Sequence, residues 1–83
     1  MSVAVCLPTG EATKIHLSSG MTVQQLRDKA VDETHRIPGF KCVRADDVRL
    51  TLGGSTLENS SPLSMFRILP STVIHLVLRV HGG

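Results

Sequence analysis

The chain has 83 residues, 41% of them hydrophobic, and its nine Lys/Arg and seven Asp/Glu leave a net charge of +2 at pH 7. A chain of this length holds one hydrophobic core, so we expect residues 1–83 to form a single domain with an aliphatic interior, because there are two Phe and no Trp or Tyr. The small net charge and the scattered basic residues argue against a protein that binds nucleic acid or a membrane surface.

The cysteines and histidines predict no chemistry of their own. Cys6 and Cys42 are far apart and form no CxxC pair, which is typical of reduced thiols in an intracellular protein. The four histidines lack metal-ligand spacing such as HExxH, so we expect neither a metal nor a cofactor. No side chains suit a nucleophile–base pair, and the sequence therefore predicts a protein that is not an enzyme.

The first twenty residues predict a β-hairpin. Residues 3–7 and 13–17 alternate aliphatic with small or polar side chains, which is the period of a strand. Residues 8–11, PTGE, have the composition of a tight turn between them. Residues 18–20, SSG, then end the second strand.

An amphipathic helix is predicted to follow. Thr22 is a good N-cap, and Gln25 three residues later completes the pattern of a capping box. Aliphatic side chains then recur at i, i+3, i+7 and i+8, and polar residues, Arg27 among them, fall on the other side. We expect the helix to end near residues 34–36, because Pro38 disfavours helical geometry in the residue before it.

The region after the helix is harder to assign. Residues 39–47 are interpreted as an insertion loop from which Phe40 and Val43 could pack onto the core. Residues 48–52 alternate like a third strand, and a glycine turn separates them from a short fourth strand at residues 56–57.

The last third of the chain predicts a helical turn and a long strand. Ser61 and Pro62 fit the N-cap and first position of that turn, which would be buried by Leu63, Phe66 and Ile68. A strand over residues 72–80 should bury one row of side chains and expose the other. The expected buried row is Ile74, Leu76 and Leu78; the expected exposed row is Val73, His75, Val77 and Arg79, with Arg49 and Thr51 as neighbours. One helix on one face of a mixed sheet is a two-layer α+β architecture, which is the fold class that the sequence predicts.

A series of short motifs runs along nearly the whole chain: Thr9-Gly10, Thr22-Val23, Ile37-Pro38, Arg49-Leu50, Leu57-Glu58, His75-Leu76-Val77-Leu78-Arg79 and Gly82-Gly83. In their order and almost in their spacing they resemble ubiquitin, and the chain looks like a diverged member of the ubiquitin-like modifier family. The resemblance implies a ubiquitin-like β-grasp fold. It comprises a mixed sheet of four to five strands, one main helix on one face, the 39–47 insertion and a flexible tail over residues 79–83.

The resemblance also implies a function. Modifiers of this family are activated with ATP and joined to target lysines through the carboxylate of their last glycine, here Gly83. Gly82 and Gly83 have no Cβ that would clash in a narrow active site. Arg79 matches a family arginine that the activating enzyme recognises through charge pairing, and His81 occupies a position where the family has another arginine. The implied partners are ubiquitin-type activating and conjugating enzymes, a deconjugating protease and target proteins. The resemblance further implies that the protein is a monomer located in the cytoplasm and nucleus. We expect it to bind neither nucleic acid nor membrane.

The family's recognition patch is altered in this sequence. Its positions hold Pro8, Thr51, His75 and Val77, with Arg49 beside them. Thr51 replaces an aliphatic residue, and one lost apolar contact costs about 1–3 kcal/mol of binding, so we expect weak binding to ordinary ubiquitin receptors. Among the family's chain-forming lysines only Lys29 has a match, which makes it the candidate acceptor lysine.

Two other functions remain open from the sequence. The chain could be a ubiquitin-like domain of a larger protein that only binds partners non-covalently, since fold alone does not decide function. It could also be a sulfur carrier in which the Gly83 carboxylate becomes a thiocarboxylate, because a His-Gly-Gly ending resembles that branch of the superfamily.

Overall fold

The computed structural model describes residues 1–78, and residues 79–83 lie outside the described part. Along the chain the elements are β1 (Ser2–Cys6), β2 (Ala12–His16), α1 (Val23–His35), the 3-10 turn η1 (Ala45–Asp47), β3 (Val48–Leu52), β4 (Ser55–Thr56), the 3-10 turn η2 (Leu63–Met65) and β5 (Val73–Leu78). The hairpin, the main helix and the later strands follow the order predicted from the sequence.

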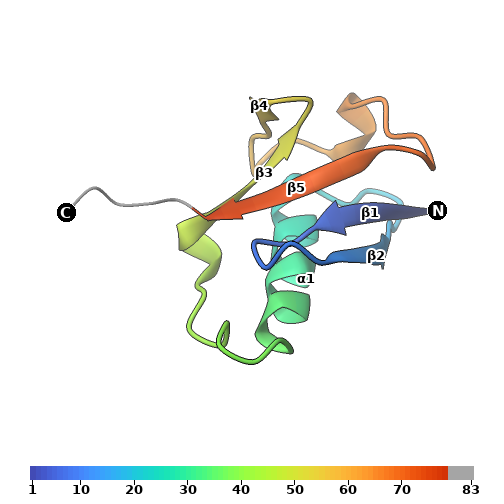
Figure 1. The fold of residues 1–83 in the computed structure, drawn as a ribbon. Coiled ribbons are helices and arrows are strands. Elements are labelled where there is room, and N and C mark those ends of the chain that lie inside the picture. Colours follow the sequence, from blue (N-terminus) through green and yellow to red (C-terminus); the bar gives the residue numbers. More distant parts are fainter. Residues whose placement is uncertain (79–83) are drawn as a thin grey trace.

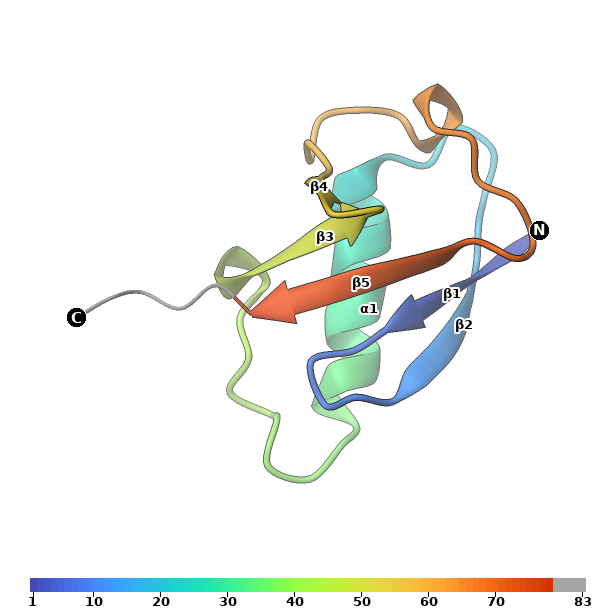
Figure 2. The same ribbon diagram turned by 45° about the horizontal axis from the view of Figure 1, so that its top comes forward.

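The strands form one five-stranded mixed sheet in the order β2-β1-β5-β3-β4. β5 lies in the middle, parallel to β1 and antiparallel to β3, while β1 and β2 form the antiparallel hairpin. α1 crosses a single face of this sheet (Figure 1), and the view in Figure 2 shows the strands lying across the helix. The architecture is therefore a two-layer α+β fold with one open sheet face.

The core lies between α1 and the sheet and is aliphatic, as predicted. Its fully buried large side chains include Val3 and Val5 on β1, Leu26 on α1, Leu50 on β3 and Ile74 on β5. Burying one such side chain contributes about 1.5–3 kcal/mol. Phe66 is only partly buried and packs against the edge of this cluster.

The turn of the first hairpin depends on a glycine. The amide of Leu7 donates to the carbonyl of Glu11 at 2.7 Å, and the amide of Gly10 donates to the carbonyl of Leu7 at 2.9 Å. Gly10 has φ +91°, a left-handed conformation that a residue with a Cβ adopts only with strain.

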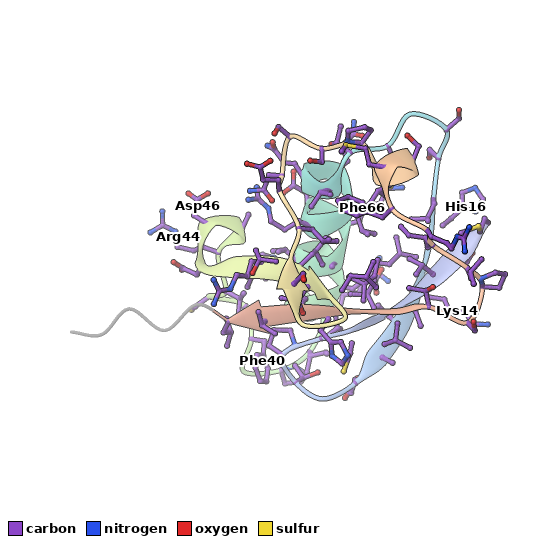
Figure 3. All side chains as sticks on the ribbon, turned by 90° about the horizontal axis from the view of Figure 1, so that it is seen from above. Lys14, His16, Phe40, Arg44, Asp46 and Phe66 are labelled. Carbon is purple, nitrogen blue, oxygen red and sulfur yellow. The ribbon has the colours of Figure 1, made fainter. Side chains whose placement is uncertain are left out.

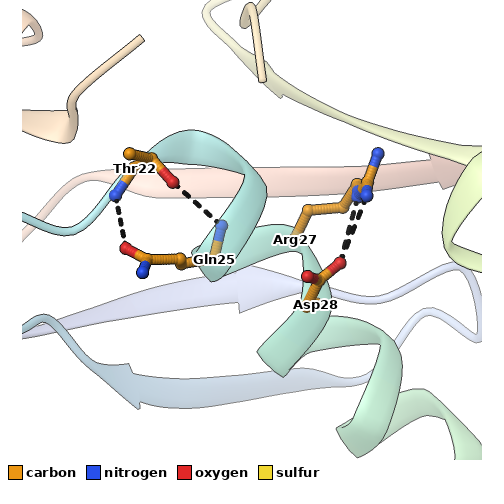
Figure 4. Close-up of polar contacts among 4 residues, drawn as sticks. All are labelled: Thr22, Gln25, Arg27 and Asp28. Carbon is orange, nitrogen blue, oxygen red and sulfur yellow. Dashed lines mark hydrogen bonds and ion pairs between the residues drawn. The ribbon is translucent and has the colours of Figure 1, made fainter. Parts of the chain in front are cut away.

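α1 begins with the predicted capping box (Figure 4). The backbone amide of Gln25 donates to Thr22 Oγ1 at 3.3 Å, and the backbone amide of Thr22 donates to Gln25 Oε1 at 2.9 Å. Each side chain thus satisfies a backbone donor that the helix itself leaves free.

The loop after β4 satisfies two further donors at the same helix end. The amide of Val23 donates to the Ser61 carbonyl at 2.9 Å, and the amide of Gln24 donates to the Asn59 carbonyl at 3.0 Å. The beginning of α1 is therefore tied to a segment more than thirty residues further along the chain.

Arg27 corrects the predicted polar side of α1. It is 8% exposed, and its Nη2 forms an ion pair with Asp28 Oδ1 at 3.2 Å (Figure 4). The long aliphatic stem of arginine can cover apolar surface while its guanidinium reaches a carboxylate near solvent. A pattern that sorts residues only as polar or apolar cannot show this.

Two expectations for the last third of the chain were wrong. Pro62 is the N-cap of η2, with ψ 144°, and not its first helical residue, and no side chain caps this turn. Leu78 is 43% exposed although it has the parity of the buried row. Leu78 is the last residue of β5, and in Figures 1 and 2 this end of the strand extends past α1.

The 39–47 insertion is attached to the end of α1. His35 in the last helical turn donates through Nε2 to the carbonyl of Val43, and the side chains of Val43 and Ala45 pack against the core. Phe40 is half-buried but is not among the side chains that pack against the core. The side chains that fix the insertion to the core are therefore those of Val43 and Ala45, and not that of Phe40.

Candidate functional site

The open face of the sheet brings together residues from three strands. Strand alternation turns Val3, Val5 and their counterparts inward, so the residues between them point to solvent. In the sheet register His75 on β5 lies opposite Thr51 on β3 and, on its other side, opposite Cys6 on β1. Two residues further along β5, Val77 lies opposite Arg49.

This cluster presents mixed chemistry to solvent. His75 and Arg49 are exposed, while Thr51, Val77 and Cys6 are half-buried. The surface therefore offers a guanidinium, an imidazole and a hydroxyl around a small aliphatic side chain. Such a combination suits recognition of another protein, where polar groups surround an apolar contact.

Pro8 lies at the edge of the same region. It is half-buried in the turn after β1, two residues beyond Cys6, so it continues the outward parity of that strand. Its ring fixes the backbone φ and removes an amide donor from the turn. Of the predicted surface residues, the structure places Arg49, Thr51, His75 and Val77 together by register and Pro8 beside them.

Cys6 is the member of this cluster that sequence reasoning missed. The sequence indicates only a reduced thiol at this position, whereas the parallel pairing of β1 with β5 places Cys6 next to His75. Its parity with Ser2 and Ala4 shows that it points outward. Only the strand order, which alternation does not give, shows which residue it neighbours.

The predicted acceptor lysine lies on the other layer. Lys29 is exposed on α1, whereas the recognition cluster belongs to the open face of the sheet. The sheet lies between the two, so the structure does not bring Lys29 together with the cluster.

The predicted conjugation and activation residues fall outside the described residues. These are Arg79, His81, Gly82 and Gly83. The described chain ends with β5 at Leu78, which lies opposite Val48. Because β5 is parallel to β1, the carboxyl end of β5 lies at the same end of the sheet as the turn that contains Pro8.

Within residues 1–78 no group of three or more His, Cys, Asp or Glu side chains is placed to hold a metal ion. Cys6 and Cys42 are both free thiols in this structure. In the same part of the chain, no helix has the length and apolar character needed to cross a membrane.

A curated protein and a solved structure are each similar to nearly the whole chain. No family model matches it. The ubiquitin-like protein NEDD8 of Dictyostelium discoideum is 29% identical over 83 residues, covering 100% of this chain and 99% of that protein. The fold is similar to the solution structure of a computationally designed protein based on the template of human erythrocytic ubiquitin. That similarity has a TM-score of 0.76 and 24% identity, and covers 99% of this chain and 95% of that one.

These similarities confirm the fold expected from the resemblance, a ubiquitin-like fold with a mixed five-stranded sheet and one helix. The identity is low, and the altered patch positions show where the sequence has diverged. The chain is therefore similar to a ubiquitin-like protein over its whole length and has a ubiquitin-like fold.

Proposed function

We propose that the chain is a covalent protein modifier and that Gly83 is its point of attachment. The observation that supports this most is the sequence HLVLRVHGG in a chain with a ubiquitin-like fold: the central strand β5 ends at Leu78, and the sequence continues with Arg-Val-His-Gly-Gly. The relative named ubiquitin-like protein NEDD8 covers the same length of chain.

The proposed chemistry is acyl transfer in three steps. The Gly83 carboxylate attacks the α-phosphorus of ATP and releases pyrophosphate. A cysteine thiolate of an activating enzyme then displaces AMP and forms a thioester, which passes to a conjugating enzyme by exchange of one thiolate for another. Finally a lysine amine of the target displaces the thiolate, loses a proton and forms an amide.

The chain itself contributes position and not catalysis in this proposal. Gly82 and Gly83 carry no Cβ, so the carboxylate can enter a narrow active site. Arg79 offers a guanidinium that can pair with a carboxylate of the activating enzyme, and His81, two residues later in the sequence, would be recognised by the same enzyme. A deconjugating protease would cleave the same amide.

We further propose that the cluster of Pro8, Arg49, Thr51, His75 and Val77 is the non-covalent recognition surface, and that Lys29 is the acceptor if chains form. The exposed positions of Arg49, His75 and Lys29 support these roles. The protein would act as a monomer in the cytoplasm and nucleus, without a cofactor of its own.

The experiment is an activation assay. The full chain is incubated with ATP and an activating enzyme, either the ubiquitin-type or the NEDD8-type, and a thiol-sensitive adduct is sought on a non-reducing gel. A chain lacking Gly83 is the matched control. We expect an adduct with the full chain and none with the chain that lacks Gly83.

The other outcomes separate the alternatives. No adduct with either enzyme, combined with the mass change of an oxygen-to-sulfur exchange on Gly83, would favour the sulfur carrier. No adduct and no mass change would contradict covalent use of Gly83 by these enzymes and favour a domain that only binds.

A further inference from the structure

We propose that the open sheet face carries a second docking surface, which takes an acidic segment of a partner protein that also bears an aliphatic side chain. Its centre is Lys14 on β2, Ala4 on β1 and Val73 on β5, which we call the Lys14 row. The row lies beside the recognition cluster on the same open face. The proposal of this second surface does not otherwise depend on the proposed function.

The sheet register builds this row. Lys14 lies opposite Ala4, and Ala4 lies opposite Val73. Neighbouring strands are about 4.8 Å apart, so the row spans about 10 Å across three strands. His16, two residues beyond Lys14 on the same face, lies opposite Ser2 and extends the surface along β2.

The shape and exposure of the row suit a small apolar contact beside a charge. Lys14 is exposed, Val73 is 45% exposed, and Ala4 between them is half-buried. Alanine has the smallest side chain of the three, and it lies between the valine and the lysine in the sheet register. An aliphatic side chain of a partner can therefore pack on the exposed part of Val73 and on the methylene groups of Lys14.

The charge distribution determines the kind of partner. All seven Asp and Glu residues lie in the described part of the chain, and none takes an outward position on a strand. They are Asp28, Asp32 and Glu33 on α1, Asp46 and Asp47 in η1, Glu11 in the first turn and Glu58 after β4. The open face instead carries the cations Lys14 and Arg49. A face with cations and no carboxylate between them attracts acidic groups.

The Lys14 row is also distant from the mixed charges of the insertion. Figure 3 shows Lys14 and His16 on the opposite side of the molecule from Arg44 and Asp46. Glu11 is three residues before Lys14 along the chain, which is about 10 Å in an extended strand. The positive potential at the row is therefore not cancelled by an adjacent carboxylate.

The same features favour a peptide over a nucleic acid. Proteins that bind nucleic acid neutralise many phosphates, whereas this face offers two permanent cations on a chain of net charge +2. Val73 and Ala4 at the centre of the row would have no role against a phosphate backbone. An acidic peptide with an aliphatic residue uses both parts of the surface.

The test uses the full isotope-labelled chain and a short synthetic peptide of glutamates around two leucines. Two control peptides replace the glutamates with lysines or the leucines with serines. We expect the glutamate–leucine peptide to shift the amide resonances of Ala4, Lys14 and Val73. Lys14→Glu should weaken its binding about tenfold, and Val73→Thr, which keeps the shape but removes an apolar methyl, about threefold.

The matched control is Lys41→Glu, which makes the same charge change at an exposed position in the insertion. It should change the affinity by less than about twofold, because Lys41 lies in the segment between α1 and η1 and not on a strand of the open face, and exposed charges are screened by salt. Equal weakening by Lys14→Glu and Lys41→Glu would overturn the proposal, because it would show attraction to net charge alone. Resonance shifts elsewhere, equal binding of the lysine peptide, or equal binding of a short oligothymidylate would overturn it too.

Failure here is distinguishable from failure of the proposed function. Peptide binding should persist in the chain that lacks Gly83, and the Lys14→Glu chain should still form the Gly83-dependent adduct with the activating enzyme. A Lys14→Glu chain that loses both would show damage to the fold, which the dispersion of its amide resonances reports directly. The Val73→Thr chain then tests the row, since it leaves the charge unchanged.

Discussion

The two faces of the sheet follow different rules. On the covered face every central position is a buried aliphatic residue, as at Leu50 and Ile74, and the chain shares its fold with a ubiquitin-based design at 24% identity. On the open face the neighbouring positions Thr51 and His75 are polar and reachable by solvent. The covered face determines the fold, and the open face is free to change its partners.

The largest difference between the faces should appear in stability. Leu50 is 0% exposed, so Leu50→Ala should lower the free energy of unfolding by about 2–5 kcal/mol through lost transfer energy and a cavity. Thr51→Ala, one residue along and on the open face, should cost less than about 1 kcal/mol. Urea denaturation of both variants measures this, and similar losses would contradict the division into two faces.

Substitutions on the open face should instead change the affinity for partner proteins. Thr51→Ile restores an aliphatic side chain at the centre of the recognition cluster and should raise the affinity for a ubiquitin receptor domain about tenfold, since such a contact is worth about 1–3 kcal/mol. Its cross-strand neighbour on β4 supplies the control, Thr56→Ile. If titration calorimetry finds the same gain in affinity for both variants, the gain comes from nonspecific hydrophobic binding and not from a specific patch.

A smaller effect is expected where α1 begins. Thr22→Ala removes the acceptor of the capping box and should cost about 1 kcal/mol. Gln25→Ala removes the other half of the box and should cost less, because the exposed amide of Thr22 can then bind water. Thermal unfolding of the two variants gives the order, and a larger loss for Gln25→Ala would contradict it.

The smallest effect should come from an exposed ion pair. Arg36 Nη1 lies 3.6 Å from Glu33 Oε1, and the two side chains are 76% and 33% exposed. Such pairs contribute about 0–1 kcal/mol. Arg36→Ala should therefore leave urea stability within about 0.5 kcal/mol of the parent chain, and a loss as large as that of Leu50→Ala would refute this ranking.

Sequence periodicity was a good guide to the elements and a limited guide to their environment. Alternation and the capping pattern correctly indicated the hairpin, α1 and the last strand, because each signal is local. Arg27 and Leu78 were assigned to the wrong environment. The burial of Arg27 depends on how its stem packs, and the exposure of Leu78 depends on how far α1 extends under β5.

The candidate site shows the same limit. Parity indicated that His75 and Val77 face solvent, but it did not indicate that Cys6 lies beside His75 or that Lys14, Ala4 and Val73 form a row. Those neighbours depend on strand order and register, which join segments up to about seventy residues apart. The roles of Arg79, His81, Gly82 and Gly83 remain predictions from the resemblance.

The most direct test of covalent modification is a search for the attachment itself. Trypsin cleaves after Arg79 and would leave residues 80–83, Val-His-Gly-Gly, on the modified lysine of a target. In cells that make the tagged chain, mass spectrometry should find this remnant on target lysines, and a chain lacking Gly83 should give none. Tagged chain recovered with partners but without any such remnant would contradict the modifier and show a domain that binds without a covalent bond.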